Sequence, residues 1–245
     1  VFSLGVWLLR GGTFDRGAAV REQGAWRLVG VRDGLADAFV TALATVRHGD
    51  EVTVLIGTQA GLTRVDDGRT TVLGVEQGLP DDHVAAVAGL DEELVVGTFG
   101  GGLALAAGDR WQNVAPGELP SGHVQALAHD DRGRLWIGTR GGLMERSSDG
   151  WAPRPAADGP PGPRITALAV TGVGATRTLW AGTFEHGLGR LADGRWTALG
   201  VDDGLPSPEI NALVVHRDVL WVATNAGPAY LADGAFHRHP RLGEL

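Results

Sequence analysis

The 245-residue chain contains no cysteine, which excludes a disulfide framework, thiol catalysis and cysteine-ligated zinc. It also contains no lysine, so all 21 basic residues are arginine, and 29 acidic residues bring the net charge to −8. The sequence has no basic stripe of the kind that binds phosphates, and we expect no nucleic-acid partner. No apolar run approaches the roughly 18 residues of a membrane-spanning helix, so we also expect no membrane insertion.

Glycine, by contrast, is abundant, with 39 residues, and eight tryptophans accompany it. The glycines follow no three-residue period, which excludes collagen, and a hydrophobic fraction of 43% can form a packed core. The chain is therefore a globular protein whose glycines need another explanation.

A repeat of about 42 residues supplies that explanation. The pair Gly-Thr recurs at intervals of 40 to 45 residues, beginning at Gly12, Gly57, Gly97, Gly138 and Gly182, with Ala223-Thr224 as a sixth copy. Upstream of each pair stands a β-branched residue followed by any residue, a small one and an aliphatic one, as in VQAL at Val124. Six copies of both signatures indicate six repeats.

Each repeat contains four short candidate strands separated by turn sequences. In the fourth copy we predict strand A over Val124–His129, B over Leu135–Thr139, C over Leu143–Arg146 and D over Trp151–Arg154. Frequent Gly, Pro and Asp-Gly breakers leave no room for the helices of an α-solenoid. The sequence predicts an all-β fold, a six-bladed β-propeller of four-stranded antiparallel blades. We expect one domain over residues 1–245, with blades at about 1–39, 40–83, 84–123, 124–164, 165–209 and 210–245.

The stretch LPSGHVQALAHDDRGRLWIGTRGGLMER, from Leu119 to Arg146, resembles the two-component regulator propeller repeat, as does its near match from Gly204 to Tyr230. The resemblance extends over essentially the whole chain and is closest in blades 4, 5 and 6. It implies a bacterial, extracytoplasmic protein, periplasmic or secreted, that senses a ligand or binds a protein.

Propeller topology places the B–C loops and the D–A linkers on one face, where we expect binding. Residues that vary between copies lie either just before strand A or just after Gly-Thr. Aromatic rings suit stacking, whereas Arg and His suit anionic groups. The predicted ligand-binding residues are Arg16, Gln59, His83, His123, Arg140, Arg164, Glu185, His186, Glu209 and Asn225.

Plainer interpretations stand beside this one. Phe14, Phe99 and Phe184 share one repeat position, which favours packing between blades. We expect the tryptophans to be core residues first, and surfaces for ligand stacking only second. His83 and His123 occupy equivalent positions and could contribute to a metal site, but no matching carboxylate cluster accompanies them, and the Asp pairs such as Asp81-Asp82 lie in turns. We therefore expect no metal and no cofactor.

The sequence favours a non-enzymatic module that binds a small polar ligand, a peptide or a protein. A structural scaffold in a larger envelope or secreted assembly is the alternative. No nucleophile motif, phosphate loop or HExxH motif is present, so a hydrolase or lyase at the axial mouth ranks third. Its catalytic candidates would be His123, Glu185, His186 and Glu209.

Overall fold

A computed structural model describes residues 17–22, 25–48, 51–66, 69–90, 93–107, 110–154 and 159–239. The chain divides into two compact units, Val1–Pro116 and Gly117–Leu245, and each is described by itself. The prediction of one domain stays a prediction. Two elements of blade 1 expected at Val1 and Gly12 lie outside the described residues. No helix among the described residues is long and apolar enough to cross a membrane.

The first unit contains three antiparallel sheets in the described residues. A two-stranded sheet is followed by two four-stranded sheets, and 3₁₀ helices occupy two of the linkers. The elements are β1 (Ala18–Glu22), β2 (Ala25–Val29), η1 (Val31–Asp33), β3 (Val40–His48), β4 (Glu51–Thr58), β5 (Gly61–Asp66), β6 (Arg69–Leu73), η2 (Val75–Gln77), β7 (Val84–Leu90), β8 (Glu93–Thr98), β9 (Leu103–Ala107) and β10 (Arg110–Val114). The helix η3 (Pro116–Glu118) lies at the boundary of the units.

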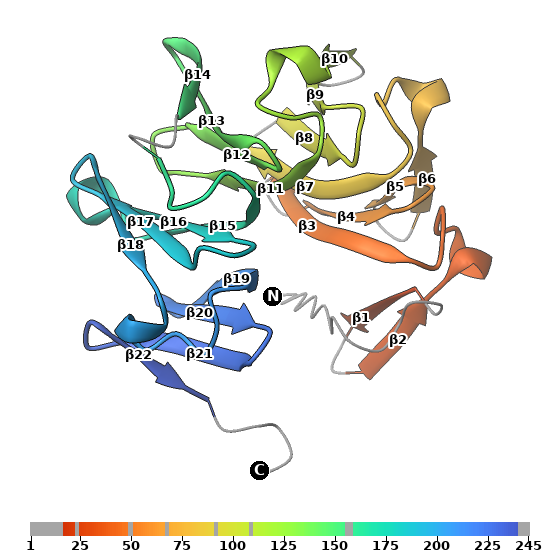
Figure 1. Ribbon diagram of the computed structural model, residues 1–245. Coiled ribbons are helices and arrows are strands. Elements are labelled where there is room, and N and C mark those ends of the chain that lie inside the picture. The colour runs from red at the N-terminus through yellow and green to blue at the C-terminus, as the bar shows by residue number, and fades with distance from the viewer. Residues whose placement is uncertain are drawn as a thin grey trace. The chain divides into compact units, whose positions relative to one another are not determined.

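The second unit contains three four-stranded antiparallel sheets, drawn from green to blue in Figure 1. Its strands are β11 (Val124–His129), β12 (Leu135–Thr139), β13 (Gly142–Ser147), β14 (Gly150–Arg154), β15 (Ile165–Thr171), β16 (Thr178–Thr183), β17 (Leu188–Ala192), β18 (Arg195–Leu199), β19 (Ile210–His216), β20 (Val219–Thr224), β21 (Gly227–Ala232) and β22 (Ala235–Arg238). Two further 3₁₀ helices are η5 (Gly174–Thr176) and η6 (Val201–Asp203).

Every four-stranded sheet pairs its strands in chain order, so each of the five repeats that contain such a sheet forms one meander. The four strands predicted in the fourth copy are confirmed, strands A and B to the residue and strands C and D to within one residue at each end. The first strands of successive sheets lie against each other, β3 with β7 in the first unit and β11 with β15 and β15 with β19 in the second. We call the six repeats blades 1 to 6 and their strands A to D.

The Gly-Thr signature is explained by packing between neighbouring blades. A Cβ on Gly138 would lie 2.6 Å from Ile165 Cγ2, and one on Gly182 would lie 2.5 Å from Ile210 Cγ2. Strand B therefore needs glycine there, because the β-branched residue that begins the next strand A fills the space of a side chain. Gly57 and Val84 repeat this arrangement in the first unit. The two sequence signatures are thus the two halves of one contact.

The threonine of the signature fastens the B–C turn. In blade 5 the Thr183 hydroxyl donates to the Gly187 carbonyl at 2.7 Å, and the same bond forms from Thr58, Thr98, Thr139 and Thr224 in their own blades. Gly187 has a φ of 77°, and a Cβ there would lie 2.3 Å from the Leu199 carbonyl oxygen. Only glycine fits this turn, so the B–C glycines are scaffold, as predicted.

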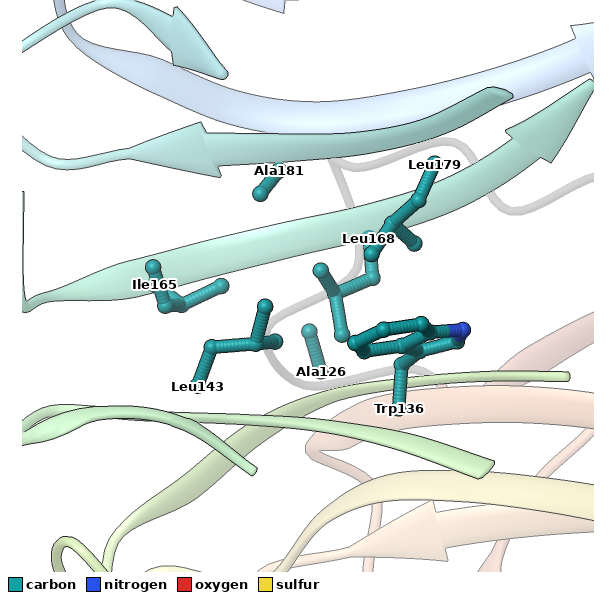
Figure 2. Close-up of a cluster of buried hydrophobic side chains, with 7 residues drawn as sticks. All are labelled: Ala126, Trp136, Leu143, Ile165, Leu168, Leu179 and Ala181. Atoms are coloured by element: carbon teal, nitrogen blue, oxygen red, sulfur yellow. The ribbon is translucent and has the colours of Figure 1, made fainter. Parts of the chain in front are cut away.

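Apolar side chains from adjacent sheets meet between blades 4 and 5. Figure 2 shows Trp136, Leu143 and Ala126 of blade 4 facing Ile165 and Leu168 of blade 5. Trp136 and Ile165 are fully buried, and Trp180 takes a similar place in the cluster between blades 5 and 6. These strand B tryptophans are core residues, as expected, whereas Trp151 on strand D is 39% exposed.

Candidate functional site

Short turns fix the residue that precedes each strand A. The backbone N–H of His83 donates to Asp81 Oδ1 at 2.9 Å, and those of His123 and Glu209 donate to the hydroxyls of Ser121 and Ser207 at 3.2 Å. Asp and Ser close such turns with their own side chains. The D–A linkers therefore hold these positions in a defined orientation.

The same residue is also tied to the residue that follows Gly-Thr. The N–H of that second residue donates to the carbonyl of the first, from Phe99 to His83 at 2.9 Å, from Arg140 to His123 at 3.1 Å, from Phe184 to Arg164 at 3.1 Å and from Asn225 to Glu209 at 3.4 Å. We call each such couple a strand-end pair. The expectation that the B–C loop and the D–A linker meet at one end of the blade is met in blades 3 to 6.

Side chains within three of the pairs also contact each other. The His83 and Phe99 rings stack with centroids 4.7 Å apart and an interplanar angle of 12°. The Arg164 Cζ lies 3.8 Å from the centroid of the Phe184 ring. The Asn225 amide donates to the Glu209 carboxylate. One backbone frame thus carries a different chemistry in each blade.

The predicted binding residues fall into three groups. Arg16 lies outside the described residues, and Gln59 and His83 belong to the first unit, where Gln59 is exposed. The second unit brings together three strand-end pairs on adjacent blades and the exposed residues Glu185 and His186. The seven predicted residues of the second unit are His123, Arg140, Arg164, Glu185, His186, Glu209 and Asn225.

The structure changes the interpretation of one of the three phenylalanines that share a repeat position. Phe99 is 37% exposed and stacks on His83 of its own blade, so it lacks the burial expected of a packing residue between blades. Phe184 is half-buried beneath Arg164, and Phe14 lies outside the described residues. Packing between blades therefore does not explain Phe99.

A metal site finds no support among the residues that the structure describes, which contain no group of three or more potential His, Asp or Glu ligands. His83 and His123 belong to different units. The Asp81 and Asp82 carboxylates accept backbone N–H groups, from His83 and from Val75 at 2.8 Å. Asp203 likewise accepts the N–H of Gly200. These acids complete turns, which is the simpler role considered from the sequence.

Sequence reasoning missed the second position of the strand A signature. Each described strand A shifts register at this residue, which forms a β-bulge; the bulge residues are Thr41, Ala85, Gln125, Thr166 and Asn211. The Thr41 and Thr166 hydroxyls donate to the next strand A, at Val84 O and Ile210 O, both at 2.5 Å. Gln125 replaces threonine in blade 4, and its Oε1 is buried with no hydrogen-bond partner. The sequence does contain a signal for this position, because the second residue of the strand A signature varies between the repeats.

The opposite ends of the same strands carry a network of ion pairs. Asp130, which follows β11, accepts a hydrogen bond from Arg134 Nε at 2.7 Å. Arg134 Nη1 also lies 3.2 Å from Glu145 Oε1. Arg154 pairs with the same Glu145 carboxylate. We call this end, formed by the A–B turns of blades 4 and 5, the turn end.

Blade 5 joins this network through Arg177. Its guanidinium pairs with Asp131, and its Nε lies 3.7 Å from Asp130 Oδ2. The hydrogen bond from Arg177, with a second from the Gly174 N–H, lowers the pKa of Asp131 to about 2. Burial by itself raises the pKa of Asp130, but bonds from Arg134 and from two backbone N–H groups outweigh it and leave the pKa below its ordinary value. Both carboxylates are therefore held in their charged form.

A family model described as two component regulator propeller matches residues 118–141, which contain the linker, β11, β12 and the strand-end pair of blade 4. The chain contains a two-component regulator propeller repeat. No curated protein matches the chain.

Solved structures share the fold over nearly the whole chain. The extracellular domain of a protein assigned as the hybrid two component system BT3049 from B. thetaiotaomicron has a TM-score of 0.76 at 18% identity, over 96% of this chain and 33% of that one. YCF48 bound to D1 peptide has a TM-score of 0.63 at 13% identity, over 94% and 77% of the two chains. An ancestral GH74 enzyme has a TM-score of 0.60 at 12% identity, over 82% and 31%. The fold is a six-bladed β-propeller, as predicted, and the chain spans about a third of the first relative.

Proposed function

We propose that the chain is a non-enzymatic β-propeller module that senses a ligand or binds a protein through its strand-end pairs. The observation that supports this proposal is that the backbone geometry of the pairs is constant while their side chains vary. The backbone bond of each pair recurs in four blades, whereas its side chains change from His and Phe to His and Arg, Arg and Phe, and Glu and Asn. A repeat that keeps the frame and varies the side chains is built for recognition.

The second unit offers the most complete set of such residues. Its three pairs lie on blades whose A strands contact one another, β11 with β15 and β15 with β19. They place imidazole, guanidinium, an aromatic ring, a carboxylate and an amide at the same ends of neighbouring strands. This mixture suits a polar small molecule or a peptide, because it offers stacking together with charged donors and acceptors.

The relatives support the proposal at the level of fold. One is an extracellular domain of an assigned two component system, and another is a propeller bound to a peptide. We therefore propose an extracytoplasmic location and a small polar ligand, peptide or protein as the partner. The likeness to a GH74 enzyme, at 12% identity, extends to the fold alone. The Glu209 carboxylate, one of the catalytic candidates, accepts a hydrogen bond from the Asn225 amide.

Thermal unfolding of the full chain against small polar compounds and short peptides tests the proposal. A ligand present at 100 times its Kd stabilises the native state by about 2.7 kcal/mol. For a protein of this size that raises the Tm by roughly 5 to 10 °C. Replacing His123 or Arg140 by alanine should abolish the rise.

Arg195→Ala is the matched control, because Arg195 is exposed at the start of β18, next to the C–D turn of blade 5 and away from the strand-end pairs. It should leave the rise intact. A compound that stabilises the wild type and all three variants equally binds elsewhere and contradicts the proposed surface. A broad screen without any stabilising compound contradicts ligand sensing.

A further inference from the structure

Arg164 differs from three other half-buried arginines of the second unit. Arg134, Arg154 and Arg177 each lie against at least one carboxylate, Asp130, Asp131 or Glu145. For Arg164, the described residues provide a ring, Phe184, but neither a carboxylate nor any hydrogen-bond acceptor, and its Nε is buried without a partner. A buried guanidinium N–H with no acceptor is unfavourable, so an anion that accepts a hydrogen bond from this side chain would be stabilised.

The geometry of Arg164 prepares it for that role. Its carbonyl is held by the N–H of Phe184 at 3.1 Å, and its guanidinium lies over the Phe184 ring at 3.8 Å. Stacking occupies the flat face of a guanidinium and leaves its terminal N–H groups at the edge, in the fork arrangement that matches a carboxylate. The side chain is therefore oriented before any ligand arrives, which reduces the entropy lost on binding.

The nearby acids do not supply the missing charge. Glu209, in the equivalent position of blade 6, accepts the Asn225 amide. Glu185 follows Phe184 in the chain, but its side chain is exposed, and no ion pair joins it to Arg164 in the described residues.

A second unsatisfied group lies on the neighbouring blade. Ile165 packs on Gly138 and Ala126 of blade 4, which brings the start of β15 beside the part of β11 that contains Gln125. Gln125 Oε1 is buried at the bulge and lacks a donor, whereas Thr41 and Thr166 satisfy this position in their own blades. The acceptor on β11 and the cation just before β15 are the two groups that a ligand with an N–H next to a carboxylate would satisfy.

We propose that Arg164, stacked on Phe184, binds the carboxylate of an acylated amino acid or of a peptide C-terminus, and that the Gln125 side chain turns to accept the adjacent N–H. This inference rests on the proposed function and specifies its ligand class. Both sources present the same chemistry, a carboxylate one carbon away from an amide N–H.

The test follows the Nε–Hε NMR signal of Arg164 in the full chain labelled with ¹⁵N-arginine, assigned through Arg164→Lys. N-acetylalanine and a penta-alanine peptide with a free C-terminus should shift this signal in a saturable way. Their C-terminal amides should not. Tighter binding of the pentapeptide identifies a peptide as the source, and equal binding identifies a single residue. Propionate, which has the carboxylate but no N–H, should bind several-fold more weakly than N-acetylalanine, and Gln125→Ala should remove that difference.

Substitutions of opposite sign sharpen the test. Arg164→Gln should weaken binding at least about tenfold, because it removes a charge-assisted contact. Glu185→Gln should strengthen binding about twofold to fivefold by removing a nearby negative charge. Arg190→Gln is the matched control, since Arg190 also lies over a ring, that of Trp180, on strand C of the same blade. It should change neither the affinity nor the Arg164 signal. Circular dichroism and the Tm confirm that each variant folds.

Several results would overturn the inference. They are unchanged affinity in Arg164→Gln, equal binding of the amides, or equal binding of inorganic phosphate. A ligand found in the thermal screen that needs His123 and Arg140 but not Arg164 would leave the proposed function standing and reject this ligand class. If the carboxylates bind through Arg164 while variants of His123 and Arg140 have no effect, the inference holds and the wider surface fails.

Discussion

The two ends of the strands in blades 4 and 5 use charge in opposite ways. At the turn end, Asp130 and Asp131 meet Arg134 and Arg177, and the ion pairs extend from one blade to the next. At the other end, the strand-end pairs hold Arg164 over a ring without a carboxylate. Both ends belong to the same strands and the same repeat, so the fold does not impose the difference.

This comparison separates charges that hold the protein together from charges available to a ligand. A carboxylate and a guanidinium that satisfy each other contribute to the native state and offer little to a third group. A polar group left unsatisfied lowers stability and gains when a partner arrives. The turn end should therefore control stability, and the strand-end pairs should control binding.

Removing Asp130 should produce the largest loss. Its side chain is fully buried, and it accepts the N–H groups of Arg132 and Arg134 as well as two guanidinium contacts. We expect Asp130→Ala to lower the free energy of unfolding by about 3 kcal/mol, because a buried ion pair loses one partner. Glu209→Ala removes a carboxylate from the strand-end pair of blade 6 and should lower it by less than about 1 kcal/mol. Urea denaturation measures both, and equal losses would contradict the conclusion that the turn end controls stability.

Much of this architecture could be predicted because small residues recur at fixed positions of the repeat. Gly138 belongs to the Gly-Thr motif and Ile165 to the strand A signature, and the two residues contact each other between blades. This contact explains why the two motifs recur together at a regular interval. Strands A and B of blade 4 were placed to the residue for the same reason: Val124 and Thr139 each begin or end a pattern that recurs six times.

The pairing of functional residues could not be predicted in the same way. Arg164 and Phe184 are 20 positions apart, and the sequence places them on one face without showing that they stack. Arg177 was not singled out, because an arginine in an A–B turn gives no sign of reaching Asp131 in the preceding blade. Which arginine receives a carboxylate is decided by side-chain geometry between blades, and no periodic pattern encodes it.

Gly138→Ala tests whether the contact between blades is independent of charge. The new Cβ would lie 2.6 Å from Ile165 Cγ2 and 3.1 Å from its Cβ, so the buried side chain must shift. Overpacking of this kind lowers the free energy of unfolding by about 2 kcal/mol. Ile165→Ala in the same chain removes the clashing atoms, so a double-mutant cycle by urea denaturation should show favourable coupling between the two changes. Strict additivity would contradict the contact.

Gln125→Thr should stabilise the protein, because Gln125 leaves a buried acceptor unpaired. A threonine there can donate to the Ile165 carbonyl as Thr166 donates to Ile210 O, and it removes the buried, unpaired Oε1. One added hydrogen bond raises the free energy of unfolding by about 1 kcal/mol. Thr166→Gln, the reverse change, should lower it by a similar amount. If Gln125→Thr proves less stable than the wild type, Gln125 has a structural partner. The unpaired groups at the binding end would then not lower the stability of the protein.

The smallest effect should be the acid response of Asp131, which lies at the outer edge of the turn end. Its pKa falls from an ordinary value of 3.8 to about 2 in the folded protein, because Arg177 and the Gly174 N–H favour the charged carboxylate. A depressed folded pKa means that the stabilisation is complete above about pH 4 and is lost as the pH falls towards 2. The side chain is 31% exposed, so solvent screening keeps the contribution modest. The Tm of the wild type should therefore fall more steeply between pH 4 and pH 2 than that of Asp131→Asn, and parallel curves would show that Arg177 does not stabilise this carboxylate.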